Sequence, residues 1–343
     1  MELLQVEQEA SVPWIVWAAF VKTVLFVVCL GLLYKAVTVY TKGVCRSTQQ
    51  MDGKTVIITG GNAGIGKETA MELARRKARV ILACRNLEKA NEAAREILAE
   101  TGQSVVVKHL DLASFKSVRK FARDIVDTEA RLDVLINNAG MIHDSNTVKL
   151  TEDGYEVCFQ SNYLSHFLLT VLLLDLLKKS APSRIINLSS VLHFFGSIQY
   201  FEDKARGTYP WKYPLLVYSN TKLAINAFTR VLSKKLIDYG VTVNSLHPGT
   251  VKTNIANEAP GLLTFLFMLC NFYGKTPKEG AQTTLHLALE PSLEKTTGVY
   301  FVDCSKARVA FSLLNRDLSE RVFEATVKLV NLDDSEIGKL LDT

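Results

Sequence analysis

Short apolar runs alternate with longer stretches of helical period along the chain after Met51. The apolar runs are rich in Val, Ile and Leu, which is typical of strands buried on both faces. The predicted strands are residues 55–59, 79–83, 105–110, 134–137, 184–188, 241–246 and 298–302. The predicted helices are residues 64–76, 87–101, 114–128, 154–179, 218–239 and 277–289, with Ser114 as an N-cap. This alternation predicts an α/β, Rossmann-type doubly wound parallel sheet of about seven strands.

Residues 12–33 form an apolar run that holds one charge, Lys22. As a helix, the run would be about 33 Å long, enough to cross a hydrocarbon core of roughly 30 Å. A central Lys costs about 2.5 to 3.5 kcal/mol on insertion scales, and ten or more apolar residues offset it. We expect a single-pass, uncleaved membrane anchor, with a helix lying in the membrane interface as the alternative.

The flanks of the apolar run predict its orientation. Acidic residues precede the run and no small-residue cleavage site follows it, which argues against a cleaved signal peptide. Lys35, Lys42 and Arg46 follow the run, and no Lys or Arg precedes it. The positive-inside rule therefore predicts that the chain after the anchor faces the cytosol.

The composition narrows the class of protein. The chain has 343 residues, of which 48% are apolar, so it can bury a sizeable core and is not disordered. Its six cysteines form no CxxC pair or Cys/His cluster, which excludes a disulfide scaffold and gives no metal site. The net charge of +5 is interleaved along the chain, so no nucleic-acid partner is expected. No linker or internal repeat divides the remainder; we expect an anchor and juxtamembrane segment over residues 1–50 and one domain with a C-terminal extension over residues 51–343.

A glycine turn directly follows the first predicted strand and opens the first helix. It contains Gly60, Gly64 and Gly66. Glycines let backbone N–H groups approach a pyrophosphate, and the helix N-terminus favours its charge. A P-loop would need Ser or Thr after Lys67, where Glu68 stands instead, so nucleotide hydrolysis is not expected. The alternative is a turn that serves tight packing alone.

The end of the second predicted strand bears on which dinucleotide binds. An acid there favours the ribose 2′-hydroxyl of NAD, and an arginine favours the 2′-phosphate of NADP. Arg85 occupies this place and no acid does. A charge-assisted pair with the phosphate predicts NADP(H) as cofactor; the alternative is that Arg85 stacks on the adenine or faces solvent.

Tyr218 and Lys222 are separated by one helical turn and so share one face of the predicted helix. An adjacent ammonium favours the phenolate, so we expect Lys222 to lower the pKa of Tyr218 toward the range useful for proton transfer. Such a pair also occurs by chance on solvated helices. The strand over residues 184–188 strengthens the catalytic interpretation of this pair, because it brings Ser189 and Ser190 to the sheet edge where ligands of open α/β sheets bind.

Together the glycine turn, the serine, the tyrosine and the lysine resemble the short-chain dehydrogenase/reductase family over roughly residues 53–305. The resemblance implies a catalytic tetrad of Asn162, Ser190, Tyr218 and Lys222, in which Asn162 holds a water of the proton relay. It also implies that Asp111 contacts the adenine and that the segment from Pro248 onward wraps the nicotinamide carboxamide. The cofactor-binding residues expected in this chain are Gly60, Asn62, Gly64, Ile65, Gly66, Arg85, Asp111, Asn138, Ala139, Gly140, Tyr218, Lys222, Pro248, Gly249, Val251 and Thr253.

Within that family the chain is similar to the membrane-anchored retinol dehydrogenase branch. The similarity rests on the motifs Ala83-Cys84-Arg85, 181–187 and 247–251, and on the 28 residues that separate Ser190 from Tyr218. It implies an apolar alcohol and its aldehyde or ketone as substrates, with retinol and retinal or a related lipid aldehyde first. A steroid or acyl-chain ketone is the alternative substrate, and a non-catalytic dinucleotide-binding membrane scaffold is the alternative function.

Two further segments bear on the substrate and the membrane. The apolar run that begins at Leu262 and ends at Tyr273 is too short to span, and we expect it to line a lipid channel or dip into the bilayer, with a buried helix as the alternative. The aromatic-rich stretch 192–214 is expected to form another pocket wall.

The histidines at 143, 166 and 193 lack the spacing of metal ligands and are expected to be structural. The resemblance suggests the endoplasmic reticulum first, then lipid droplet or mitochondrion, and leaves a homodimer open.

Overall fold

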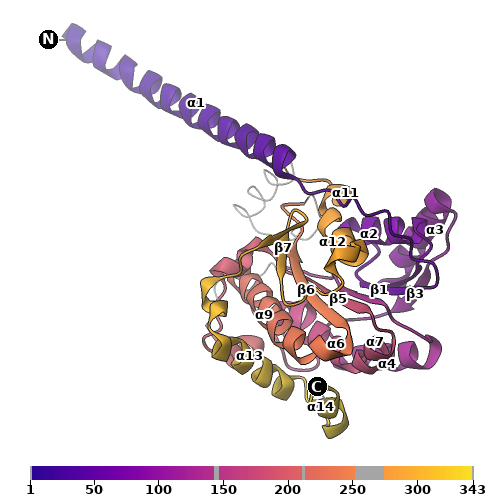
Figure 1. The fold of residues 1–343 in the computed structure, drawn as a ribbon. Coiled ribbons are helices and arrows are strands. Elements are labelled where there is room, and N and C mark those ends of the chain that lie inside the picture. Colours follow the sequence, from indigo (N-terminus) through magenta and orange to yellow (C-terminus); the bar gives the residue numbers. More distant parts are fainter. Residues whose placement is uncertain (1, 143–146, 211–212, 252–273, 342–343) are drawn as a thin grey trace.

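The structure is a computed structural model that describes residues 2–142, 147–210, 213–251 and 274–341. An eight-stranded sheet forms its centre, with the order β3-β2-β1-β4-β5-β6-β7-β8 (Figure 1). The seven strands from β1 to β7 run parallel, as predicted. Their bounds are β1 Thr55–Thr59, β2 Arg79–Cys84, β3 Val106–His109, β4 Val134–Asn137, β5 Ser183–Leu188, β6 Val241–His247 and β7 Tyr300–Val302.

The sheet has one strand more than the expected count of about seven. The additional strand β8, Ser305–Ala307, pairs antiparallel with β7 at the edge of the sheet. Its three residues are exposed, so it carries no apolar pattern that would have predicted it. Asp303 and Cys304 form the turn between the two strands, and both have positive φ values, 50° and 59°. A two-residue hairpin turn of this kind requires left-handed backbone at both positions.

Helices cover both faces of the sheet and separate its core into two clusters. Alternate strand residues point to opposite faces, so Val56 and Ile58 pack beneath α2, α3 and α12, whereas Ile57 packs beneath α4, α6 and α9. Figure 1 shows these two groups on opposite sides of the strands. The helices of the first face are α2 Gly64–Arg75, α3 Leu87–Thr101, α11 Pro277–Gly280 and α12 Gln282–Leu289, and those of the second are α4 Phe115–Thr128, α6 Ser165–Leu172, α7 Leu174–Lys179 and α9 Pro214–Lys235.

Three predicted helices differ from the structure. The stretch 154–179 is interrupted: α5 (Val157–Phe159) leads into a π-helical turn, η1 (Gln160–Leu164), which precedes α6 and α7. The helix expected from residue 218 begins at Pro214, where proline suits the first helical position. The helix expected over 277–289 is divided into α11 and α12 at Ala281. Ser114 caps α4 as predicted, because its hydroxyl accepts a hydrogen bond from the Ser117 amide at 3.3 Å.

The aromatic-rich stretch 192–214 overlaps a 3-10 helix, η2 (Val191–Phe195), and contains the short helix α8 (Phe201–Ala205). Phe201 is buried and contacts the rings of Phe159 and Tyr163 with centroid distances of 5.3 and 6.1 Å. Phe195 and Tyr213 are exposed. The aromatic residues that the structure describes in this stretch are therefore divided between the core and the surface.

The C-terminal extension packs on the second helical face. It contains the 3-10 turn η6 (Phe311–Leu314) and the helices α13 (Arg316–Leu329) and α14 (Asp334–Leu341). Tyr163 and Thr326 share a hydrogen bond of 2.8 Å between their hydroxyls, and the Phe167 and Phe323 rings meet edge to face at 5.2 Å. The extension thereby covers α6 and α9.

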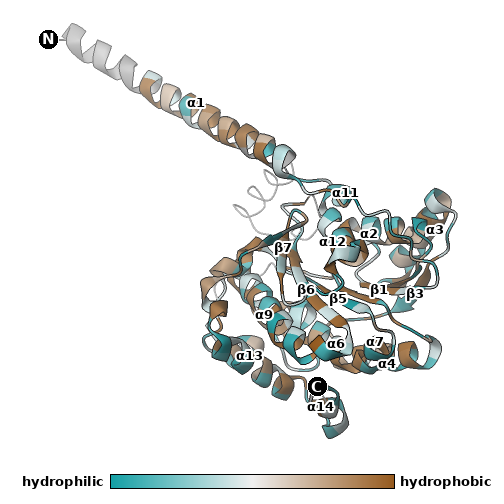
Figure 2. Ribbon diagram, in the orientation of Figure 1, coloured by the Kyte–Doolittle hydropathy of each residue, from teal (hydrophilic) through white to brown (hydrophobic). Residues whose placement is uncertain are grey.

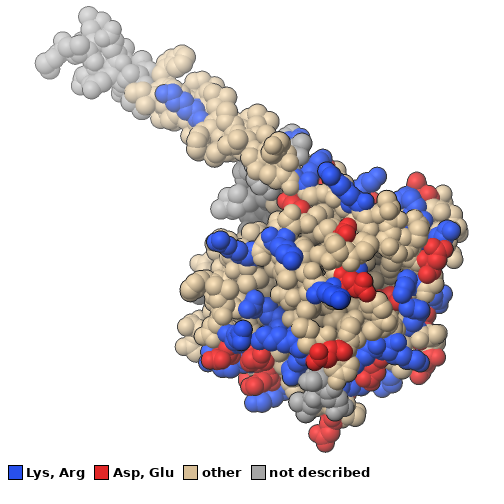
Figure 3. All heavy atoms as spheres, viewed as in Figure 1, with Lys and Arg blue, Asp and Glu red and all other residues tan. Residues whose placement is uncertain are grey.

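The N-terminal helix α1 (Glu2–Thr41) projects from the rest of the molecule (Figure 1). Its segment Trp14–Val37 has a mean hydropathy of 2.4 and is long and apolar enough to cross a membrane. This segment begins and ends slightly later than the predicted run of residues 12–33. Figure 2 shows it as the most continuous hydrophobic stretch of the ribbon, and Figure 3 shows a nearly uncharged rod beside a domain on whose visible face both charge signs are interspersed.

Candidate active site

The glycine turn between β1 and α2 has the backbone that its sequence predicts. Gly60 and Gly64 have φ values of 65° and 54°, in the left-handed region that glycine adopts without strain. A Cβ at Gly66 would lie 2.5 Å from the Gly60 carbonyl oxygen and 2.6 Å from the side-chain nitrogen of Asn138. The N-cap residue Ala63 provides no side-chain cap for α2. The first turn of α2 therefore presents amide groups that can donate hydrogen bonds to an anion.

Thr59, at the end of β1, joins the glycine turn to the loop that follows β4. Its hydroxyl oxygen accepts hydrogen bonds from the amides of Asn138 at 2.9 Å and Ala139 at 3.0 Å. The Asn138 side chain donates to the Thr59 carbonyl oxygen at 2.8 Å. Sequence reasoning did not single out Thr59, because a threonine at a strand end has many structural uses.

The π-helical turn η1 carries Asn162, whose side chain bonds Met141 in the loop that follows β4. The Asn162 side chain accepts a hydrogen bond from the Met141 amide and donates one to its carbonyl oxygen, both at 2.8 Å. A Cβ at Gly140 would lie 3.7 Å from both the Asn162 Oδ1 and the Lys222 Nζ atoms. Gly140 thus lies between two members of the predicted tetrad. Single π-turns inside α-helices are frequent at functional sites.

Ser189 and Ser190 directly follow β5, and they have different partners. Ser189 donates its hydroxyl to the Lys222 carbonyl oxygen at 3.0 Å, which ties β5 to α9. Ser190 forms a side-chain hydrogen bond with Tyr218. Its hydroxyl oxygen also accepts from the Leu192 amide at 3.2 Å and so caps η2. The serine that faces the tyrosine is therefore Ser190.

Tyr218 and Lys222 lie on one face of α9, and both are buried. The Lys222 ammonium donates to the Leu188 carbonyl oxygen at 2.8 Å and lies 5.2 Å from the centroid of the Tyr218 ring. Burial lowers the pKa of Lys222 to about 8. The expectation of a lowered tyrosine pKa is wrong for this structure: burial raises the pKa of Tyr218, and the hydrogen bond from Ser190 offsets only part of the effect.

Cys158 is a buried neighbour of the tetrad that sequence reasoning missed. Its thiol donates to the Met141 carbonyl oxygen at 3.2 Å and accepts from the Asn162 side chain at 3.2 Å. It packs in the same small apolar cluster as Tyr218. Cys158 belongs to no CxxC or Cys/His motif, so the sequence gives no pattern that would have indicated this position.

Arg85 and Asp111 come to one edge of the sheet at the ends of β2 and β3. The Leu110 amide donates to the Cys84 carbonyl oxygen at 3.0 Å, which places the two following residues on adjacent strand ends. Arg85 is exposed and Asp111 is half-buried. The Asp111 carboxylate accepts from the Ala113 amide at 2.9 Å. The hydrogen bonds of Asp111 in this structure are to Ser117 and Ala113 and not to the tetrad.

The segment after β6 lies beside the glycine turn. A Cβ at Gly280 in α11 would lie 2.6 Å from Val251 and 3.2 Å from Ile65 of the turn. Pro248, Gly249 and Val251 therefore belong to the same edge of the sheet as the tetrad. Thr253 and the run from Leu262 to Tyr273 lie outside the described residues.

His166 and His193, two of the histidines expected to be structural, have hydrogen-bond partners within the fold. The ring nitrogens of His166 contact the Asn162 carbonyl oxygen at 3.0 Å and the Thr59 hydroxyl at 2.9 Å. His193 contacts the Ser190 carbonyl oxygen at 2.6 Å and accepts from the Ala310 amide at 3.0 Å. Burial lowers the pKa of His166 to about 4, so this side chain is neutral at physiological pH. His143 lies outside the described residues.

Comparison with known proteins supports the resemblance to the short-chain dehydrogenase/reductase family. The profile of the short chain dehydrogenase family matches residues 54–202 and 206–261. The chain is 44% identical to retinol dehydrogenase 11 of Homo sapiens over 306 residues, which cover 88% of this chain and 94% of that protein. It is 44% identical to retinol dehydrogenase 13 of Homo sapiens over 300 residues, covering 85% and 89% of the two chains. A short chain dehydrogenase from Shigella flexneri, solved in complex with NADP, has 27% identity and a TM-score of 0.58, and the alignment covers 75% of this chain and 99% of that one.

Proposed function

The chain belongs to the short-chain dehydrogenase/reductase family and is an oxidoreductase related to retinol dehydrogenases, and from this premise we propose its specific activity. It is an NADP(H)-dependent enzyme that interconverts an apolar alcohol and its aldehyde or ketone, with retinol and retinal or a related lipid aldehyde as the first substrates to test. One observation carries the proposal. Tyr218 is buried and hydrogen bonded to Ser190, and its ring centroid lies 5.2 Å from the Lys222 ammonium. It lies at the same edge of the sheet as the glycine turn.

The residues at this edge fit a dinucleotide. Gly60 and Gly64 adopt positive φ, and no side chain caps the first amides of α2, so these amides can donate hydrogen bonds to a pyrophosphate. At the adenosine end, the exposed guanidinium of Arg85 suits a 2′-phosphate, and the position offers no carboxylate for a 2′-hydroxyl. These features favour NADP(H), which supplies the transferred hydride when it is bound.

The side chains of the tetrad hold and move the proton. The raised pKa of Tyr218 keeps its hydroxyl protonated at neutral pH, so it can donate a proton to the oxygen of a carbonyl as that oxygen gains negative charge. Ser190, which already bonds Tyr218, orients that oxygen. Lys222 stabilises the phenolate that remains after the transfer. Asn162 fixes Met141 and the loop after β4, and connects the relay to solvent through a water.

The N-terminal helix supports the proposal that the substrate is apolar and dissolved in the membrane. We propose that Trp14–Val37 anchors the catalytic unit of residues 51–343 in a membrane, with Lys35, Lys42 and Arg46 on the cytosolic side. The endoplasmic reticulum is the first compartment to test.

The test uses the full chain in lipid nanodiscs with NADPH or NADH and a panel of retinal, medium-chain aldehydes and ketosteroids. We expect NADPH-dependent reduction of at least one apolar carbonyl, with NADPH preferred. Tyr218→Phe removes only the proton-donating hydroxyl, so it should abolish turnover and leave NADPH binding unchanged. Inactivity of the wild type on the whole panel, with NADPH bound, would favour the scaffold, and turnover by Tyr218→Phe would remove this residue from its role.

A further inference from the structure

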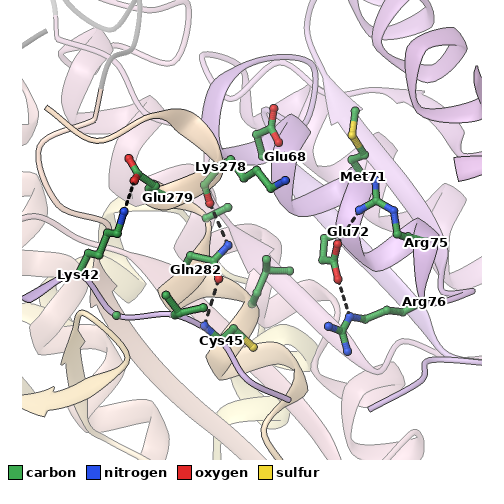
Figure 4. A pocket seen from close by; sticks show the side chains of 14 residues that line it. Lys42, Cys45, Glu68, Met71, Glu72, Arg75, Arg76, Lys278, Glu279 and Gln282 are labelled. Carbon is green, nitrogen blue, oxygen red and sulfur yellow. Dashed lines mark hydrogen bonds and ion pairs between the residues drawn. The ribbon is translucent and has the colours of Figure 1, made fainter. Parts of the chain in front are cut away.

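The segment that leaves α1 is hydrogen bonded to the catalytic domain from its first residues. We refer to residues 42–47 as the juxtamembrane segment. Figure 4 shows the bonds from Lys42 to Glu279 and from Cys45 to Gln282. The segment also forms one wall of a cavity of about 390 Å³, whose other walls come from α2, α11 and α12. Its hydrogen bonds join Lys42 to Glu279 at 2.7 Å, Gly43 to Asp303 at 3.3 Å, Cys45 to Gln282 at 3.1 Å and Ser47 to Leu289 at 2.9 Å.

The first connection runs through Gly43 to the turn between β7 and β8. A Cβ at Gly43 would lie 2.2 Å from the carbonyl carbon and oxygen of Asp303, so only glycine fits against this backbone. The Gly43 amide donates to the Asp303 carboxylate. Asp303 is one of the two turn residues with positive φ, so its backbone is held in an uncommon conformation where the segment contacts it.

Asp303 in turn holds Lys275 against the loop that follows β6. The Lys275 ammonium, which is buried, forms an ion pair with the Asp303 carboxylate. The Lys275 amide donates to the Thr250 carbonyl oxygen at 2.8 Å. A Cβ at Gly249 would lie 2.8 Å from the Lys275 side chain, so the stem of this lysine covers Gly249 directly. The lysine therefore supports the loop through both its backbone and its side chain.

The second connection runs through Lys42 to α11. One oxygen of the Glu279 carboxylate accepts from Lys42, and the other closes the capping box with Thr276 at the N-terminus of α11. Gly280, the next residue, is the point where α11 contacts both Val251 and Ile65. Lys42 thus fixes the helix end that packs between the loop after β6 and the glycine turn.

We propose that Lys42 and Gly43 are positioning residues for the dinucleotide site, which they support through Glu279 and Asp303. The inference rests on the proposed function and on the role that the family resemblance implies for the segment from Pro248 onward, which is to hold the nicotinamide end of the cofactor. Two separate connections from adjacent residues converge on this loop, so the attachment of the N-terminal helix contributes to cofactor binding as well as to location.

The test compares Gly43→Ala with Val44→Ala in full-length protein in lipid nanodiscs. Val44 is the neighbouring residue and its side chain is exposed, so its truncation controls for any change in the segment. We expect Gly43→Ala to raise both the Kd and the KM for NADPH about fivefold or more, with a smaller change in kcat, and Val44→Ala to match the wild type.

A second variant guards against misfolding of the first. Lys42→Met removes the ion pair to Glu279 and retains the apolar stem, and we expect a smaller rise in the Kd for NADPH. Lower Tm values with an unchanged Kd in both variants would assign the segment a purely structural role and overturn the inference. A wild type that binds no NADPH would instead overturn the proposed function, and the inference with it.

Discussion

The Lys222 ammonium lies 5.2 Å from the centroid of the Tyr218 ring, one helical turn along α9. Both side chains are buried, and burial acts on them in opposite directions: it raises the pKa of the phenol and lowers the pKa of the amine to about 8. In each case burial favours the neutral form. At neutral pH the tyrosine can therefore donate a proton while most of the lysine remains charged beside it.

We expect carbonyl reduction to slow as the pH rises above about 8. Lys222 is protonated below this pKa and neutral above it, and only the charged form stabilises the phenolate left after proton donation. The measurement is kcat/KM for the carbonyl substrate from about pH 6 to about pH 10 at saturating NADPH, since kcat/KM reports ionisations of the form that binds the substrate. A profile that stays flat across this range would show that the charge of Lys222 has no part in the chemistry.

Arg85→Asp should reverse the preference for NADPH. A charge-assisted bond to a phosphate contributes roughly 1.5 to 3 kcal/mol, so its loss should lower the ratio of NADPH to NADH affinity by about tenfold to a hundredfold. Fluorescence titration of both dinucleotides measures this ratio. Arg85 is exposed, so the fold should tolerate the change, and Arg95→Asp on the exposed face of α3 serves as a control for altered charge. An unchanged ratio would refute the role of Arg85.

Thr59→Val should destabilise the fold and weaken dinucleotide binding. The substitution removes the oxygen that accepts from the Asn138 and Ala139 amides. The Asn138 amide keeps a second acceptor, the Ile136 carbonyl oxygen at 3.0 Å, whereas the Ala139 amide loses the acceptor that Thr59 provides. A buried donor left unpaired costs about 1 to 3 kcal/mol, and the half-buried Ala139 amide should cost toward the lower end of this range. Thr59→Ser retains the hydroxyl and should stay within about 1 kcal/mol of the wild type. Thermal unfolding measures the stability; equal Tm values for the two variants would show that the hydroxyl does not hold the loop.

The parallel strands could be predicted because each is a run of apolar residues between turns. Val56, Ile57 and Ile58 are all fully buried, and a strand covered on both faces gives a continuous apolar pattern. The same rule missed β8, whose exposed edge needs no apolar residues. The π-helical turn at Gln160–Leu164 was hidden for the opposite reason, because all five of its residues are buried and no polar face marks the change in period.

The motif residues of the site could be found because the family resemblance names them by position. The residues that support the site could not be found from the sequence, because each one contacts a partner that is distant along the chain. Gly43 and Asp303 are 260 residues apart, and Lys42 and Glu279 are 237 apart. Neither pair lies in a motif or in a periodic segment, so no local pattern links their members. The pKa of Tyr218 escaped prediction for a related reason: the sequence shows the nearby charge and not the depth of burial.

The π-helical turn makes the position of Asn162 depend on one surplus residue. A π-turn bonds each amide to the carbonyl five residues back, whereas an α-helix bonds four back. Deleting one residue between Gln160 and Leu164 would restore regular winding and rotate everything on one side of the deletion by about 100°. The amide of Asn162 would then swing away from Met141, although the overall length, composition and burial of the helix would barely change.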